Sequence, residues 1–138
     1  MTLFNLNELD DITTEPKTIV KKGELWQLGK HRLLCGDATI KSDVEKLMDE
    51  AKVDMVFTDP PYNIAYNEPN KNKRMNEVLG NKLENHIVYD CFLGSGSTLI
   101  ACEYTKRICY GLEIDEHYCG VIIDRWEKMT HKKARRLA

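Results

Sequence analysis

The sequence predicts an α/β protein built on a parallel sheet, and three observations support this fold class. Apolar segments of strand length alternate with segments of helical periodicity along the chain. The strand segments end at glycines or acidic residues, and strands that alternate with helices form parallel sheets with right-handed crossovers. The length of 138 residues suits one domain, while 42% hydrophobic and 30% charged residues exclude collagen-like, fully disordered and membrane proteins.

Each expected element depends on a local signal. Ser42 followed by Glu45 is a capping box, so we expect a helix to begin there. Asp115 precedes a segment of helical periodicity and is expected to cap the final helix, one face of which is marked by Tyr118, Val121, Ile122, Arg125, Trp126 and Met129. The expected elements are, in chain order, a hairpin of strands over 24–28 and 31–35, a helix over 42–51, strands over 53–58 and 86–90, a helix over 98–105, a strand over 107–114 and the final helix.

One folded domain is expected over residues 23–134. Residues 1–22 have no convincing period and are interpreted as an arm or linker, whereas residues 135–138 are interpreted as a basic tail. Residues 63–85 are polar and rich in Asn and Lys, which predicts a loop. The net charge of −2 is unusual for a lone DNA-binding module, because phosphate contacts require clustered Lys and Arg.

Five cysteines lie in the chain without any C-x-x-C pair. Disulfide frameworks and zinc sites usually have even counts and tight spacings, so we expect reduced structural thiols and no metal site. No apolar run approaches the roughly 20 residues that span a bilayer, and the polar, acidic N-terminus does not resemble a secretory signal. These features predict a cytoplasmic protein that does not contact a membrane.

Acidic residues stand at the ends of four predicted strands. Ligands of open parallel α/β sheets bind beyond the carboxyl ends of the strands. Four carboxylates at corresponding positions are hard to explain as packing. We therefore expect a binding site at this edge of the sheet, with Asp37, Asp59, Asp90 and Glu113 around it.

A glycine-rich turn follows one of these strands and opens a helix. Gly94 and Gly96 allow a tight turn and a close approach of the backbone to a ligand. Asp90, immediately before the turn, would repel a phosphate but suits an ammonium group, which favours S-adenosylmethionine over a dinucleotide. Glu113, one strand later, stands where an acid accepts hydrogen bonds from ribose hydroxyls. The alternative is an ordinary turn between a strand and a helix.

A second motif, Asp59-Pro60-Pro61-Tyr62, ends the strand predicted over 53–58. Two prolines stop the strand ladder and restrict the backbone that follows. The Asp59 carboxylate and the Pro60 carbonyl would be fixed acceptors beside the ring of Tyr62, an arrangement that suits the planar amino group of a nucleobase. Prolines at a strand end can also mark a mere turn.

Together these motifs closely resemble those of the DNA amino-methyltransferases. The catalytic motif precedes the cofactor motif, an order similar to that of the β class, and the segment over 31–39 is similar to members associated with ParB-like nuclease domains or phages. The segments that carry the resemblance are 58–64, 89–98 and 111–115. The resemblance implies a Rossmann-like methyltransferase sheet, either complete or containing only part of the usual seven strands.

The resemblance also implies roles for individual residues. Asp59, Pro60, Pro61 and Tyr62 would bind a base flipped out of double-stranded DNA, and the initial Asp is usual in adenine-N6 enzymes. The cofactor would contact Asp37 near its adenine, Asp90 at its methionine moiety, Glu113 at its ribose, and the turn formed by Phe92, Gly94, Ser95 and Gly96. Methyl transfer would be direct, without a metal and without a cysteine nucleophile.

Other functions remain open from the sequence alone. The chain could methylate N4 of cytosine, or it could be a truncated cofactor-binding remnant without catalytic activity. RNA or protein amide methylation is disfavoured because those relatives typically carry Asn in place of Asp59. A dehydrogenase is disfavoured because the turn lacks a third glycine.

The interval between Asp59 and Asp90 is short, at about 30 positions. Family members of this order place further strands and a target-recognition region there, and without them the strand over 53–58 becomes an exposed edge. Either residues are missing between Asn63 and His86, or a deletion has shortened the chain, or a partner chain, such as a second copy in a homodimer, completes the sheet. If nothing is missing, we predict cofactor binding without efficient sequence-specific methylation.

Overall fold

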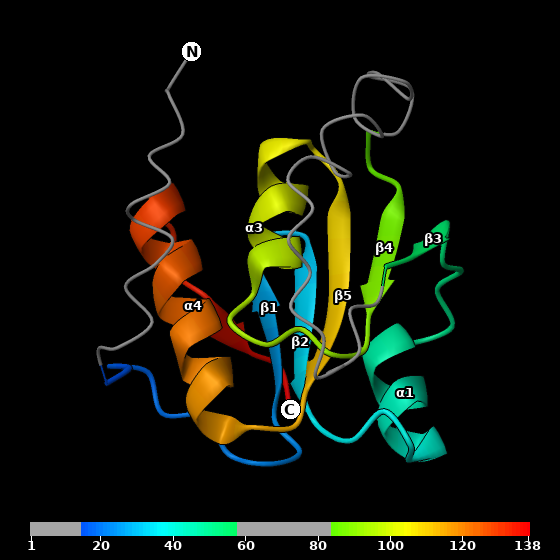
Figure 1. Cartoon of the computed structure of the whole chain (residues 1–138), viewed down its shortest axis with the longest axis horizontal. Coiled ribbons are helices and arrows are strands. Elements are labelled where there is room, and N and C mark those ends of the chain that lie inside the picture. Colours follow the sequence, from blue (N-terminus) through cyan, green and yellow to red (C-terminus); the bar gives the residue numbers. More distant parts are fainter. Residues whose placement is uncertain (1–14, 58–83) are drawn as a thin grey trace, which may run out of the picture.

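A computed structural model of the chain describes residues 15–57 and 84–138, which form one mixed sheet with three helices packed on it (Figure 1). In chain order the elements are β1 (Leu25–Leu28), β2 (His31–Cys35), α1 (Lys41–Met48), β3 (Met55–Val56), β4 (Ile87–Asp90), α3 (Ser97–Tyr104), β5 (Ile108–Glu113), α4 (Glu116–Thr130) and β6 (Arg135–Arg136). Within these described residues no helix is long and apolar enough to cross a membrane.

The strand order across the sheet is β3-β4-β5-β2-β1-β6. The first four strands of this order run parallel, whereas β1 pairs antiparallel with β2 and with β6. The α/β class and the hairpin predicted from the sequence are therefore confirmed. β3 is shorter than the strand predicted over 53–58 in the part that the structure describes, and it lies at one edge with Val56 62% exposed.

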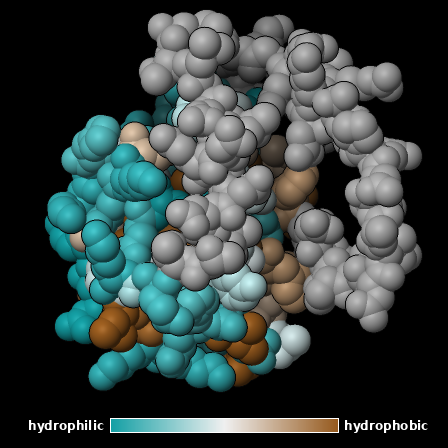
Figure 2. Space-filling view, turned by 60° about the vertical axis from the view of Figure 1, so that its left-hand side comes forward, coloured by the Kyte–Doolittle hydropathy of each residue, from teal (hydrophilic) through white to brown (hydrophobic). Residues whose placement is uncertain are grey.

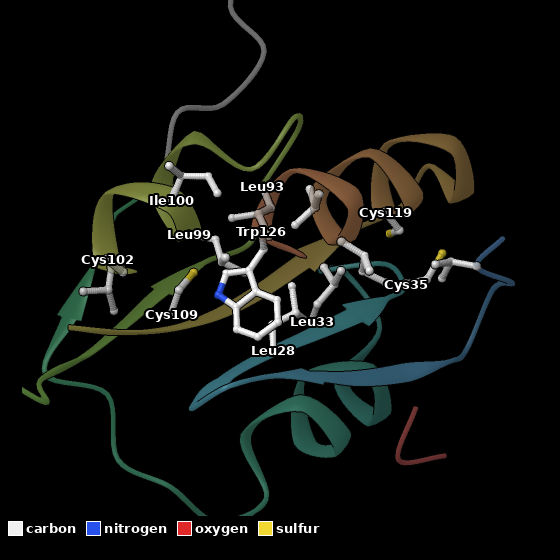
Figure 3. Packing of buried hydrophobic residues seen from close by; sticks show 14 residues of the cluster. Leu28, Leu33, Cys35, Leu93, Leu99, Ile100, Cys102, Cys109, Cys119 and Trp126 are labelled. Atoms are coloured by element: carbon white, nitrogen blue, oxygen red, sulfur yellow. The ribbon is translucent and has the colours of Figure 1, made fainter. Parts of the chain in front are cut away.

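The larger core lies between the sheet and the two helices α3 and α4. Side chains alternate across a strand, so Leu33 of β2 joins this core while Leu34 faces the other side. Trp126 of α4 is 1% exposed, and Figure 3 shows its ring at the centre, with Leu99 and Cys109 to one side and Leu28 below. This cluster fixes α4 against the sheet.

The opposite face has a smaller core beneath α1. Four fully or nearly buried leucines form it, and Val44, Tyr89 and Tyr110 pack partly buried around them; the leucines are Leu25, Leu34, Leu47 and Leu112. Arg32 lies over the ring of Tyr110 at 5.6 Å and donates to the backbone carbonyls at the end of α1.

The predicted start of α1 is wrong by one residue, and its capping box does not form. The helix begins at Lys41 after Ile40, which makes no side-chain cap hydrogen bond, so Ser42 lies inside the helix. The carboxylate of Asp37 accepts hydrogen bonds from Thr39, and that of Asp43 accepts one from the Asp37 amide at 2.9 Å. These hydrogen bonds hold the backbone of residues 37–39 in the turn before α1, so the helix begins at Lys41 rather than after Ser42.

The C-terminal end of the chain forms a strand that the sequence analysis did not predict. Arg135 and Arg136, expected in a basic tail, pair with β1, and the backbone of Leu25 exchanges hydrogen bonds with Leu137 and Ala138. Arg136 forms an ion pair with Glu24, with 3.2 Å between Nη1 and Oε1. The backbone pairing, which depends on a distant segment, explains why composition alone indicated a tail.

Residues 15–22, interpreted as an arm, contact α4. The carboxylate of Asp124 accepts hydrogen bonds from the amide of Lys17 at 2.6 Å and from the hydroxyl of Thr18 at 2.6 Å. Val20 is buried in the larger core. Around α4 the described surface is mostly hydrophilic, with only separate hydrophobic patches (Figure 2).

Candidate functional site

The carboxyl ends of β2, β4 and β5 lie at one edge of the sheet, the lower edge in Figure 1. Parallel pairing sets Cys35 opposite Glu113 and Asp90 opposite Gly111. Asp90 and Glu113 therefore end strands at this edge, and Asp37 lies two residues beyond the end of β2. Asp90 is 2% exposed and Glu113 is 8% exposed, so both carboxylates lie within the protein rather than in bulk solvent.

The glycine-rich turn leaves this edge and leads into α3. The Asp90 carboxylate accepts a hydrogen bond from the Phe92 amide at 2.9 Å, which starts the turn. Gly94 and Gly96 have φ values of +57° and +90°, a region that favours glycine. Gly96 precedes the first residue of the helix, and its amide donates to the Leu93 carbonyl at 2.9 Å.

The two glycines of the turn have different surroundings. A Cβ atom on Gly96 would stand 2.8 Å from Cγ1 of Ile122, so glycine is required there for close packing against α4. A Cβ atom on Gly94 would meet no atom of residues 15–57 and 84–138 within 4 Å. The backbone of Gly94 thus faces open space at the carboxyl edge, where a ligand could approach it.

Glu113 contacts the turn directly. Its Oε2 accepts a hydrogen bond from the Gly94 amide at 2.5 Å, and its Oε1 accepts one from the Asp115 amide at 3.1 Å. The residue thereby connects the turn to the start of α4, a role that the sequence analysis missed. A carboxylate has about four lone-pair sites, so these two bonds leave acceptor capacity for a ligand hydroxyl.

Asp37 follows β2 and has a well-defined orientation. Its Oδ1 accepts hydrogen bonds from the amide and the hydroxyl of Thr39, at 2.8 and 2.7 Å. The same hydrogen bonds from Thr39 lower the pKa of the Asp37 carboxyl. Asp37 is therefore an ionised acceptor at the edge where β2 ends.

Two apolar side chains are exposed beside these acids. Phe92 in the turn is 45% exposed, and Ile114 directly after β5 is 52% exposed. Phe92 was predicted as part of the cofactor turn, whereas Ile114 was not singled out. The signal for Ile114 was available, because an apolar residue directly follows the acid that ends a strand. Exposed apolar side chains next to carboxylates suit a ligand with both a flat ring and polar groups.

Arg125 of α4 also contacts the turn, and the sequence analysis did not assign it to the site. Its Nη1 donates a hydrogen bond to the backbone carbonyl of Ser95. The sequence did place Arg125 on the marked face of the final helix, and a cation on such a face was the signal that it binds a specific acceptor.

The Asp59-Pro60-Pro61-Tyr62 motif lies outside the described residues. The described chain reaches Phe57, whose amide donates to the Tyr89 carbonyl at 2.9 Å. β3 and β4 pair in parallel, with Val56 opposite Tyr89. The chain thus enters the motif from the strand adjacent to the one that ends at Asp90.

The cysteines lie mostly in the core. Cys35, Cys102, Cys109 and Cys119 are buried, and all five thiols are free. Cys35 and Cys119 are neighbours, and the hydrogen bond between them raises the pKa of the Cys119 thiol. Among the residues that the structure describes, no group of three His, Cys, Asp or Glu side chains could bind a metal ion.

Comparison with protein families gives a match for part of the chain. Residues 78–124 match the N6_N4_Mtase family model, described as DNA methylase, which covers roughly a third of the chain. The matched span contains β4, the glycine-rich turn, α3, β5 and most of α4, and it supports a DNA amino-methyltransferase family. Neither the curated proteins nor the solved structures contain a match to this chain.

Proposed function

We propose, with the DNA methylase match as the premise, that this chain transfers a methyl group from S-adenosylmethionine to an exocyclic amino group of DNA, N6 of adenine. One observation carries the proposal. β3 and β4 are parallel neighbours, so the segment that continues into Asp59 and the turn that begins at Asp90 leave the same edge from adjacent strands. A methyl donor and an amino acceptor must meet at such a point.

The described part of the edge fits the cofactor in several respects. The buried carboxylate of Asp90 suits the ammonium group of the methionine moiety, and the open space at Gly94 allows a ligand against the backbone. The Glu113 carboxylate has acceptor capacity left for ribose hydroxyls. The exposed ring of Phe92 offers a flat apolar surface, and Asp37 offers an ionised acceptor for the adenine amino group.

The protein's part in the chemistry is to orient the amino group. The carboxylate of Asp59 and the carbonyl of Pro60 would accept hydrogen bonds from both amino hydrogens, with the base stacked on Tyr62 and Pro61 restricting the backbone. Two such bonds favour sp3 character at nitrogen and direct its lone pair at the methyl group. The sulfonium of the bound cofactor would supply that methyl group directly: the S–CH3 bond would break as the N–CH3 bond forms, the amino nitrogen would lose one proton to solvent, and no covalent enzyme intermediate would be needed.

A second function, cofactor binding without efficient transfer, is favoured by the exposed edge. Val56 of β3 is 62% exposed, and β3 pairs only with β4 among the described strands. An apolar edge of this kind is rarely left bare in natural proteins. A partner chain that pairs with β3 would then be required for full activity.

Isotope-labelled cofactor separates these functions. Equilibrium binding of the labelled cofactor is measured first. The protein is then incubated with the labelled cofactor and unlabelled mixed-sequence DNA, and the DNA is digested to nucleosides to show which base carries the labelled methyl group. We expect Asp90→Ala to weaken cofactor binding by at least about tenfold, the loss of one charged hydrogen-bonding group. Asp59→Ala should preserve binding and abolish transfer.

Asp124→Asn is the matched control, because Asp124 also accepts backbone hydrogen bonds but lies on α4 facing the arm. It should leave cofactor binding unchanged. Wild-type affinity in the Asp90→Ala variant would contradict the proposed cofactor site. Cofactor binding with no label in DNA would favour the second function, and label on cytosine would exclude the choice of adenine.

A further inference from the structure

Helix α4 contacts the glycine-rich turn at two neighbouring points. The guanidinium group of Arg125 donates to the Ser95 carbonyl, and the side chain of Ile122 packs against Gly96. Ile122 and Arg125 are three residues apart, so they lie on the same face of the helix. The turn is therefore supported from the α4 side by both a hydrogen bond and an apolar contact.

Other charged side chains fix the same turn from the sheet. The Asp90 carboxylate accepts from the Phe92 amide, and the Glu113 carboxylate accepts from the Gly94 amide. These two carboxylates bind backbone amides of the turn, whereas the guanidinium of Arg125 binds a backbone carbonyl, that of Ser95. Successive backbone groups are thus bound by side chains from β4, β5 and α4.

Leu93 anchors the turn in the larger core, but the residues that follow it need further support. Glycine loses more backbone freedom on folding than any other residue, and within the described part of the chain no atom lies within 4 Å of the Cβ position of Gly94. Ser95 lies between Gly94, which faces open space, and Gly96, which faces α4. A hydrogen bond at the Ser95 carbonyl therefore acts where packing alone leaves the turn unrestrained on one side.

We propose that Arg125 is a positioning residue that, together with Glu113, holds the glycine-rich turn in a ligand-ready shape before the cofactor binds. The inference rests on the proposed function for the role of the ligand, but the restraint of the turn is independent of it. A turn that is already ordered loses less entropy on binding, and this raises affinity without a direct contact to the ligand.

Arg125→Met tests the proposal, because it keeps much of the aliphatic length and removes the donor. Amide hydrogen exchange reports on the turn in the free protein, and calorimetry gives cofactor affinity. We expect faster exchange at Gly94 and Gly96 and about tenfold weaker cofactor binding, since a hydrogen bond to a charged group is lost. Arg125→Lys, which retains a donor, should recover part of both effects.

Arg32→Met is the matched control. Arg32 also donates to backbone carbonyls, those of Lys46 and Leu47, but it does so at the end of α1 on the other face of the sheet. This variant should lose about as much thermal stability as Arg125→Met. Its amide exchange at Gly94 and its cofactor affinity should stay at wild-type values.

The outcomes separate the positioning role from the proposed function. Wild-type exchange rates in the turn of Arg125→Met would overturn the inference, as would equal losses of affinity in the Arg125 and Arg32 variants. If the wild-type protein binds no cofactor, the proposed function fails, and the exchange rates at Gly94 and Gly96 alone decide whether Arg125 restrains the turn.

Discussion

The two faces of the sheet differ in how much of the fold and of the site they support. The face beneath α3 and α4 contains the larger core, centred on Trp126, and both helices of this face contact or continue the glycine-rich turn. Among the described residues, the face beneath α1 contains only four buried leucines. We call the face beneath α3 and α4 the thick face and the face beneath α1 the thin face. The difference indicates that the candidate site depends on the heavily packed face, whereas the other face mainly completes the sheet.

The helices of the two faces also begin differently. The Asp115 side chain accepts hydrogen bonds from the amides of His117 and Tyr118 and so caps α4. Ile40 stands at the same position before α1 and provides no side-chain acceptor. The helix that supports the turn therefore has a side-chain cap at its start, whereas α1 has none at Ile40.

The largest expected effect is at the centre of the thick face. Trp126→Ala should lower the free energy of unfolding by about 3–5 kcal/mol, because it removes a large buried ring and leaves a cavity. Urea unfolding followed by circular dichroism measures the change. Trp126→Phe, which keeps most of the apolar volume, should cost clearly less, and a cost for Trp126→Ala below about 1.5 kcal/mol would contradict the ranking of the two faces.

Leu47→Ala removes the centre of the thin face. Leucine truncations in cores cost about 2–5 kcal/mol, and we expect a value of about 2–3 kcal/mol here because Leu47 belongs to the smaller of the two cores. The same urea experiment applies, and cofactor affinity should not change. A cost larger than that of Trp126→Ala would reverse the comparison.

The next effect is a pH dependence within the thick face. His31 is 1% exposed, its Nδ1 accepts a hydrogen bond from the Cys109 amide at 3.0 Å, and its Nε2 contacts Glu103 at 2.6 Å. Burial lowers the pKa of His31 below its usual value of 6.5, although Glu103 acts in the opposite direction. The neutral ring is the form that accepts from Cys109.

Between pH 6.5 and the lower pKa of the folded state, the unfolded chain binds a proton that the folded chain does not. Stability from His31 is therefore present above pH 6.5 and is lost as the pH falls through this window. Urea unfolding at pH 7.5 and 5.5 should show a larger loss for wild type than for His31→Gln. The substitution itself should cost about 1–3 kcal/mol at pH 7.5, through disrupted buried hydrogen bonds. An equal pH dependence in both proteins would contradict this assignment.

A smaller effect is expected at the start of α4. Asp115→Ala should destabilise the protein by about 1 kcal/mol, because two amides lose their acceptor. Thermal unfolding measures the change, and Asp115→Asn, which keeps an acceptor oxygen, serves as the control. A variant as stable as wild type would show that the cap contributes nothing.

The smallest effect is a gain at the start of α1. Ile40 is 46% exposed and its backbone has the extended conformation of a cap residue, with φ −97° and ψ 113°. Ile40→Ser should therefore raise stability by about 0.5–1 kcal/mol by supplying the missing acceptor. A loss of stability would mean that the apolar contacts of Ile40 outweigh a cap.

Several elements could be predicted because their signals are local. The hairpin around Gly29, the cap at Asp115 and the glycine-rich turn after Asp90 depend on neighbouring residues, and the structure contains all three. The periodicity of α4 likewise identified the face on which Ile122 and Trp126 are buried. Such features depend on the backbone conformation and side-chain spacing of residues that are close in the chain, so the local sequence is enough to predict them.

Other features were decided only by contacts between distant segments. β6 exists because the end of the chain pairs with β1, about 110 positions away. The contacts of Glu113 with Gly94 and of Arg125 with Ser95 join three elements across the sheet edge. The residue types at the candidate site were evident from the sequence, but the tertiary structure decided which of them restrain the turn, because a hydrogen bond requires two groups to meet in space.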